Sequence, residues 1–231
     1  PLNLLGGRSR IEYQPLGVVG VIAPWNFPIY LAFGPLAGVL AAGNRAMIKP
    51  SEFTPATSAV MAEMVADTWT ENEVAIFDGG PEVGQAFSSL PFDHLLFTGA
   101  TSIARHIMAA AARNLVPVTL ELGGKSPVII SRSADIQKSI GRIMLGKTLN
   151  AGQICLAPDY LLVPEEKLHE VIAAAQKAVS EMYPKLLDNP EYTSVINDRH
   201  YDRLNGYLTE AEERGIKTIP LNPANEDFSQ Q

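Results

Sequence analysis

The chain contains a single cysteine, Cys155, which ends the run Asn-Ala-Gly-Gln-Ile-Cys. Glu121 stands 34 residues earlier in the run Leu-Glu-Leu-Gly-Gly-Lys. A thiol and a carboxylate, each beside a glycine that permits a sharp turn, could supply a nucleophile and a base for chemistry at a carbonyl carbon. Each residue also has an ordinary reading, because a lone cysteine is often an inert buried side chain and a strand glutamate usually faces solvent.

A carboxamide could complete such a site. Asn26 lies between Pro24 and Pro28, and two prolines restrict the turn that presents its side chain. A rigid amide is a good donor to a developing oxyanion, although the same run could form a simple Asx turn. Glu121 alternates with leucines at a predicted strand end, where partial burial would make it a stronger base.

Two further turns follow predicted strands and could hold a dinucleotide. Lys49 and Glu52 could bond ribose hydroxyls, and the turn Thr98–Thr101 opens a helix whose amides could receive a phosphate. The chain has no G-x-G-x-x-G run, so the standard Rossmann fingerprint is missing. The four histidines are scattered without metal-ligand spacing, and we predict no metal site.

Composition narrows the class of protein. The net charge is −7, from 18 basic and 25 acidic residues, which argues against a nucleic-acid or an anionic membrane partner. Prolines and glycines interrupt the most apolar stretch, 27–42, which is too short to span a bilayer. The start lacks the pattern of a signal peptide. One free thiol suits a reducing compartment, so a soluble cytoplasmic protein is expected.

Short β-branched runs alternate with helical patterns along the chain. This recurrence indicates βαβ units and therefore a parallel sheet with helices on both faces. We predict an α/β fold: a Rossmann-like dinucleotide-binding domain over 15–123, a partial α/β catalytic domain over 124–231, and a lead-in segment 1–14. The expected strands are 17–23, 46–48, 74–77, 94–97, 127–130 and 160–163, with a turn at 98–100; the expected helices are 28–42, 54–69, 81–88, 102–115, 133–149, 165–182 and 199–214.

Five segments in this order resemble the aldehyde dehydrogenase superfamily. The resemblance runs from about residue 15 to about residue 163 and is strongest to the compact, class-three-like branch. Within that branch the chain is similar to the bacterial coniferyl aldehyde dehydrogenases, which implies an aldehyde substrate, such as an aromatic one. The segments are Pro24–Pro28, Lys49–Glu52, Phe97–Gly99, Leu120–Pro127 and Gly152–Cys155.

The resemblance implies a role for each candidate. Cys155 would attack the aldehyde carbon, and the side chain of Asn26 with the amide of Cys155 would hold the oxyanion. Hydride transfer to a nicotinamide would leave a thioester, which water activated by Glu121 would hydrolyse to the acid. The cofactor would be NAD or NADP. Its implied contacts are Lys49 and Glu52 at the adenosine ribose, Gly99 and Thr101 near the pyrophosphate, Leu122 and Gly123 beside the nicotinamide, and Trp25.

Departures from the family pattern imply an incomplete enzyme. Ala100 replaces a frequent serine, and the later Glu-x-Phe-Gly-Pro segment that binds the nicotinamide ribose is not found. The resemblance therefore implies an internal fragment, with exposed apolar surface and little activity, of a parent that would be a homodimer or a homotetramer. Two alternatives stay open: a coenzyme-A-acylating aldehyde dehydrogenase, and a non-catalytic dinucleotide-binding or structural protein.

Overall fold

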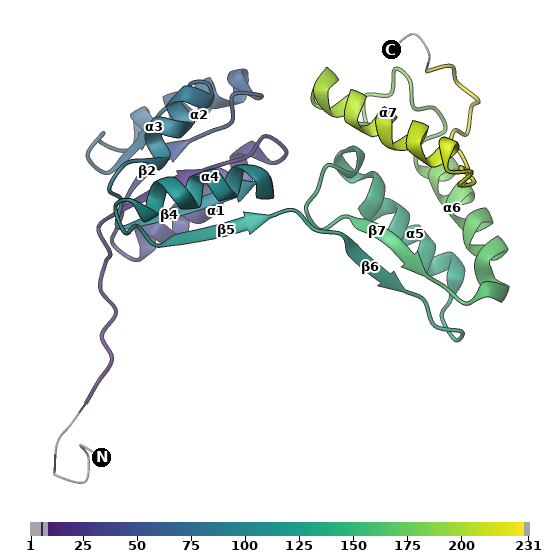
Figure 1. Cartoon of the computed structure of the whole chain (residues 1–231), viewed down its shortest axis with the longest axis horizontal. Coiled ribbons are helices and arrows are strands. Elements are labelled where there is room, and N and C mark those ends of the chain that lie inside the picture. Colours follow the sequence, from purple (N-terminus) through teal and green to yellow (C-terminus); the bar gives the residue numbers. More distant parts are fainter. Residues whose placement is uncertain (1–5, 7–8, 229–231) are drawn as a thin grey trace. The chain divides into compact units, whose positions relative to one another are not determined.

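The computed structural model describes residue 6 and residues 9–228 (Figure 1). The chain divides into two compact units, Pro1–Leu122 and Gly123–Gln231, which are described separately below. The expected lead-in segment 1–14 lies partly outside the described residues. Within the described ranges, no helix combines the length and the apolar character that a membrane crossing requires.

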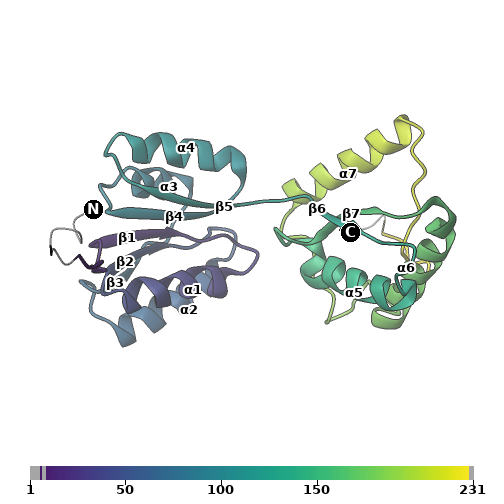
Figure 2. The ribbon, with the colours of Figure 1, turned by 90° about the horizontal axis from the view of Figure 1, so that it is seen from below.

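The first unit is a five-stranded parallel sheet in the order β3-β2-β1-β4-β5. Helices α1 and α2 lie on one face and α3 and α4 on the other (Figure 2), which confirms the predicted α/β architecture. The elements are β1 (Val18–Ile22), α1 (Pro28–Ala41), β2 (Arg45–Lys49), α2 (Pro55–Thr68), β3 (Val74–Ile76), α3 (Pro81–Ser88), β4 (His94–Gly99), α4 (Thr101–Ala112) and β5 (Val118–Leu122).

Each face of this sheet has its own core. Val21 and Ile48 are fully buried in the cluster under α1 and α2. Leu95 and Phe97 pack with α4 residues in the cluster on the other face. Strand β1 is apolar throughout because both of its faces are covered, as is usual for the central strand of a parallel sheet.

The predicted turn at residues 98–100 is wrong in part. Thr98 and Gly99 belong to β4, where they pair with Glu121 and Leu122 of β5. The local Thr-Gly-Ala signal indicated a turn, but ladder pairing with the neighbouring strand extends β4 by two residues. Only Ala100 connects β4 to α4, which begins at Thr101.

The second unit pairs two parallel strands, β6 (Ser126–Ile129) and β7 (Pro158–Leu162), and packs α5 (Ile136–Thr148) against α6 (Leu168–Met182). Their core includes Ile140 and Val171. As predicted, the residue run at 133–135 opens α5: the Asp135 carboxylate accepts a hydrogen bond from the Lys138 amide at 3.1 Å. The unit also contains α7 (Asp198–Glu213).

The predicted start of the sixth long helix, at Glu165, is wrong. Glu165–Lys167 forms the short 3₁₀ helix η3, and α6 begins at Leu168. The Lys167 amide donates to the carbonyl of Pro164, three residues back, at 2.9 Å. Such a tightened turn is common where an α-helix starts, and the helical spacing of the following residues does not distinguish it.

Candidate functional site

In the first unit, the candidates gather at one edge of the sheet. Because all five strands are parallel, the ends of β1, β2, β4 and β5 share the carboxyl edge. The chain leaves β1 for β2 on one side and reaches β4 on the other, so the topological switch point lies between β1 and β4. Ligands of open α/β sheets bind in the crevice at this point.

Asn26 and Trp25 lie in the connection from β1 to α1, and both are half-buried. The connection begins at Ala23, whose amide donates to the carbonyl of Lys49 at 3.0 Å. It ends at Phe27, which caps α1, and Pro28 occupies the first helical position. Both ends are therefore fixed, and Asn26 stands beside the switch point, in the connection that follows a strand.

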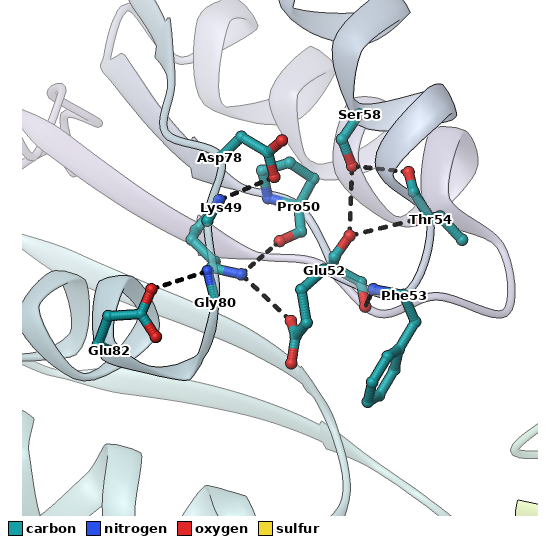
Figure 3. A network of polar contacts seen from close by, with 11 residues as sticks. Lys49, Pro50, Glu52, Phe53, Thr54, Ser58, Asp78, Gly80 and Glu82 are labelled. Carbon is teal, nitrogen blue, oxygen red and sulfur yellow. Dashed lines mark hydrogen bonds and ion pairs between the residues drawn. The ribbon is translucent and has the colours of Figure 1, made fainter. Parts of the chain in front are cut away.

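Lys49 ends β2 and its side chain is almost completely buried, with 3% of the residue exposed. The Nζ atom donates to the carbonyl of Pro50 at 2.8 Å and to Oε2 of Glu52 at 3.3 Å (Figure 3). A buried ammonium requires such partners, since an unpaired charge would be strongly destabilised. The structure thus brings Lys49 and Glu52 together at the same edge.

Hydrogen bonds order the loop that carries Glu52. The carbonyl of Ser51 accepts from the hydroxyl of the fully buried Ser58 at 3.3 Å and from that of Thr54 at 3.4 Å (Figure 3). Thr54 is the cap residue of α2, as predicted, but its side chain makes no capping hydrogen bond to the helix. The loop is instead held through the Ser51 carbonyl.

Gly99 and Thr101 lie across the switch point, where β4 passes into α4. A Cβ atom on Gly99 would stand 2.6 Å from the ring of Phe97, so this position requires glycine unless the ring moves. Ala100 caps α4 without a side-chain hydrogen bond, and Thr101 is exposed. First-turn amides of a helix capped in this way remain available to an anion.

Glu121 is exposed, so the expected partial burial is wrong for this chain. Glu121 belongs to β5, an edge strand, and pairs with Thr98 of β4. Its side chain lies on the same face of the sheet as that of Thr119. That face is the one that α1 and α2 cover, but α1 packs against β1 and β2 rather than β5. Leu122 points to the opposite face and packs on the α4 cluster, and Gly123 opens the second unit.

In the second unit, Cys155 is exposed on the turn Ile154–Ala157 immediately before β7. Strands β6 and β7 start side by side, with Ser126 paired to Pro158. This pairing brings Gly124 to the backbone of Cys155: a Cβ atom on Gly124 would stand 2.9 Å from the Cys155 carbonyl oxygen. Gly124, the second of the two glycines that follow Leu122, therefore lies against the thiol-bearing turn.

The backbone before Cys155 is strained. Asn150, Ala151 and Gly152 all have positive φ, at 52°, 52° and 75°. The left-handed conformation costs about 1–2 kcal/mol for a residue such as Ala151, whereas asparagine and glycine adopt it more readily. Residues held in this way concentrate at functional sites and persist only where their surroundings enforce them.

Gln153 connects this turn to a distant part of the unit. Its Nε2 donates to the carbonyls of Asn150 and Ser194, each at 3.1 Å, and its Oε1 accepts from the amide of Ile196 at 3.0 Å. Reasoning from the sequence gives Gln153 no role. The position of a glutamine between a glycine and the lone cysteine was the one indication in the sequence. Its partners Ser194 and Ile196 lie more than 40 residues away, so the local pattern does not reveal them.

Two groups with lowered pKa values, Glu73 and His200, lie one in each unit. Hydrogen bonds from the backbone and hydroxyl of Thr70 lower the pKa of Glu73 in the first unit. Burial, followed by the nearby charges of Arg203 and Arg199, lowers the pKa of His200 in the second. Because one of these groups lies in each unit, the stability of the two units should respond to pH over different ranges.

Comparison with known sequences identifies a family. The Aldehyde dehydrogenase family profile matches residues 4–227. A probable coniferyl aldehyde dehydrogenase of Caulobacter vibrioides is 63% identical over 230 residues, covering 100% of this chain and 47% of that protein. A coniferyl aldehyde dehydrogenase of a Pseudomonas species is 63% identical over 96% of this chain and 46% of its own length. The chain thus spans about half the length of these relatives.

Solved structures give the same result. A substrate-bound AldH of Staphylococcus aureus matches with a TM-score of 0.83 at 43% identity, over 87% of this chain and 44% of that one. An aldehyde dehydrogenase of Mycobacterium tuberculosis complexed with NAD+ matches with a TM-score of 0.79 at 34% identity, over 87% of this chain and 42% of that one. By sequence and by fold, the chain belongs to the aldehyde dehydrogenase family.

Proposed function

We propose that the whole protein oxidises an aldehyde to the carboxylic acid with NAD or NADP as the hydride acceptor. The first unit would be its dinucleotide-binding domain and the second a part of its catalytic domain. The observation that supports this most is the clustering of Asn26, the Lys49–Glu52 pair and the Gly99–Thr101 turn along the carboxyl edge of one parallel sheet. That edge is where this fold class binds nucleotides.

The first chemical step in this proposal is attack by the thiolate of Cys155 on the aldehyde carbon. The carbonyl oxygen becomes an oxyanion, which the Asn26 carboxamide and the Cys155 amide would stabilise by hydrogen bonding. Exposure of the thiol favours this role, because a reagent must reach it. The product of the step is a thiohemiacetal on Cys155.

Release of the acid requires water. After the carbon has been oxidised, Cys155 carries a thioester, and Glu121 would accept a proton from the water that attacks it. The attack expels the thiolate, which restores Cys155 for another cycle. Glu121 is exposed in this chain, and solvent can therefore deliver the water.

The described residues fit a dinucleotide. Lys49 and Glu52 offer a donor and an acceptor for ribose hydroxyls, and the start of α4, where no side chain makes a capping hydrogen bond, offers amides for the pyrophosphate. Trp25, Leu122 and Gly123 would complete the cofactor contacts. The bound nicotinamide supplies a hydride acceptor, which no side chain can replace. Glu52 would repel the 2′-phosphate of NADP, which favours NAD.

The names of the relatives suggest the substrate class. We propose an aromatic aldehyde such as coniferyl aldehyde, because two relatives at 63% identity carry that activity in their names. A homodimer or homotetramer and a cytoplasmic location are also proposals; the single free thiol supports the second of these.

The primary experiment measures formation of reduced cofactor by the whole protein over a panel of aromatic and aliphatic aldehydes, with NAD and NADP in turn. We expect turnover with aromatic aldehydes and a preference for NAD. Absence of turnover throughout, together with a Cys155 that iodoacetamide alkylates no faster than an ordinary thiol, would support the non-catalytic alternative.

A Glu121→Gln variant separates hydrolysis from acyl transfer to coenzyme A. If Glu121 activates water, the variant should give a burst of about one reduced cofactor per site, followed by steady-state turnover about 10²–10⁴-fold slower. An unchanged steady state that requires coenzyme A would instead favour the acylating enzyme. The exposed Glu63→Gln on α2 is the matched control.

A further inference from the structure

The three residues Asn150–Gly152, which precede the turn that carries Cys155, have a left-handed conformation that an alanine does not favour. Asn150 and Ala151 are left-handed without being glycine, and Gly152 continues the same conformation. Gly152 is confined as well, since a Cβ there would stand 3.0 Å from the Lys147 carbonyl. Something outside these residues must therefore hold the turn in place.

The side chain of Gln153 connects the turn to a segment outside it. Its amide nitrogen bonds the Asn150 carbonyl inside the turn and the Ser194 carbonyl outside it, both at 3.1 Å. Its oxygen accepts from the Ile196 amide at 3.0 Å. A carboxamide can make all three bonds because it carries two N–H donors and an acceptor oxygen.

No other side chain of similar size could replace these bonds. A glutamate would place a carboxylate oxygen against two carbonyl oxygens, and a methionine would leave the two carbonyls and the amide without these bonds. Gln153 precedes Cys155 by two residues and is half-buried, so displacement of its side chain would be transmitted to the turn.

We propose that Gln153 is a positioning residue, which fastens the strained turn to the segment 194–196 and thereby orients the Cys155 thiol for attack on the aldehyde. This inference rests on the proposed function. Gln153 does not touch the reacting atoms; it acts through the backbone from Asn150 to Cys155. An error of about 1 Å in such an orientation can reduce the rate about 100-fold.

The test uses Gln153→Met and Gln153→Glu in the whole protein, with Gln176→Met as the matched control on the exposed face of α6. We expect kcat to fall about 100-fold in Gln153→Met and at least as far in Gln153→Glu, with the Kd for NAD unchanged. Amide hydrogen exchange over residues 149–157 should accelerate in both variants and remain as in wild type in Gln176→Met.

The inference would be overturned by a kcat within about threefold of wild type in Gln153→Met, or by unchanged hydrogen exchange over residues 149–157. A fall in kcat accompanied by an equal loss of NAD affinity would also overturn it, because it would indicate general unfolding. If the wild-type protein oxidises no aldehyde, the proposed function fails by itself, and hydrogen exchange still decides whether Gln153 holds the turn.

Discussion

The two units present their candidate residues in different ways. In the first, Asn26, Lys49 and Gly99 stand at or just beyond the ends of strands in a sheet with a buried core on each face. In the second, Cys155 stands after three consecutive left-handed residues, beside a sheet of two strands. The candidates of the first unit are positioned by the regular pairing of parallel strands. Cys155 is positioned by a turn that side-chain hydrogen bonds hold.

This difference suits the two tasks that we propose. A cofactor that binds and leaves can be recognised by backbone and side-chain groups aligned along a sheet edge. A nucleophile must hold one direction against thermal motion, and a turn with few alternatives can enforce it. Changes at Lys49, Glu52 and the Gly99–Thr101 turn should therefore alter cofactor affinity, whereas changes around the turn before Cys155 should alter kcat.

The largest effect is expected from Cys155→Ser. A serine hydroxyl is a weak nucleophile without an adjacent base, so kcat/KM should fall on the order of 10⁴-fold or more while NAD affinity stays the same. Stopped-flow burst kinetics and calorimetry on the whole protein measure the two quantities. Ser180→Ala, on an exposed position of α6, is the control. A burst that survives in Cys155→Ser would remove the thiol from the chemistry.

Gly124→Ala should have the next largest effect. The added Cβ would stand 2.9 Å from the Cys155 carbonyl oxygen, a backbone atom that can move only if the turn moves. We expect kcat to fall about 100-fold with little change in NAD affinity. Gly141→Ala provides the contrast, because the space around Gly141 in α5 is open and alanine favours a helix. Equal activity in the two variants would contradict the proposed sensitivity of the turn.

Lys49→Met tests the first unit. Loss of the buried ammonium removes its bonds to the Pro50 carbonyl and Glu52, and any bond to the cofactor ribose. The KM for NAD should rise about tenfold with kcat nearly unchanged. Lys177→Met, on the surface of α6, should change neither quantity. If Lys49→Met lowers kcat and leaves KM alone, the cofactor-binding role proposed for Lys49 is wrong.

The sequence predicts the first unit better than the second because the two depend on different distances along the chain. Alternation of strand and helix patterns predicts a parallel sheet, and parallel strands put their carboxyl ends at one edge, so Lys49 and Gly99 follow from local signals. The exposure of Glu121 depends on which strand lies at the edge, which no local pattern specifies. The bonds of Gln153 to Ser194 and Ile196 cross about 40 residues.

Strain can be compared directly between the units with one substitution in each. Ala151 before the thiol turn and Leu115 after α4 have φ values of 52° and 56°. Replacing either with glycine should relieve strain and stabilise folding by about 0.5–1 kcal/mol, after the entropic cost of glycine. Only Ala151→Gly should also lower kcat, by a few fold, because it loosens the turn. Denaturant titration and steady-state kinetics measure both; a loss of activity in Leu115→Gly would be unexpected.

The smallest effect concerns pH. The folded pKa of His200 lies below its ordinary value of 6.5, so the stability it contributes is present above that value and is lost as pH falls through the folded pKa. The folded pKa of Glu73 lies below its ordinary value of 4.5, so the stability that Glu73 contributes is lost only at lower pH. Between about pH 7.5 and about pH 5.5, hydrogen exchange measured relative to the intrinsic rate of each amide at that pH should therefore accelerate at the start of α7 and not around residue 73.

His200→Gln should abolish that acceleration, and Glu73→Gln should leave it in place. Burial lowers the pKa of His200, and so do the positive charges of Arg203 and Arg199. Protonation of His200 therefore adds a third positive charge at the start of a helix, where the helix dipole also disfavours cations. Equal acceleration in both segments over this interval would mean that a shared opening sets the response, and titration would then not distinguish the two units.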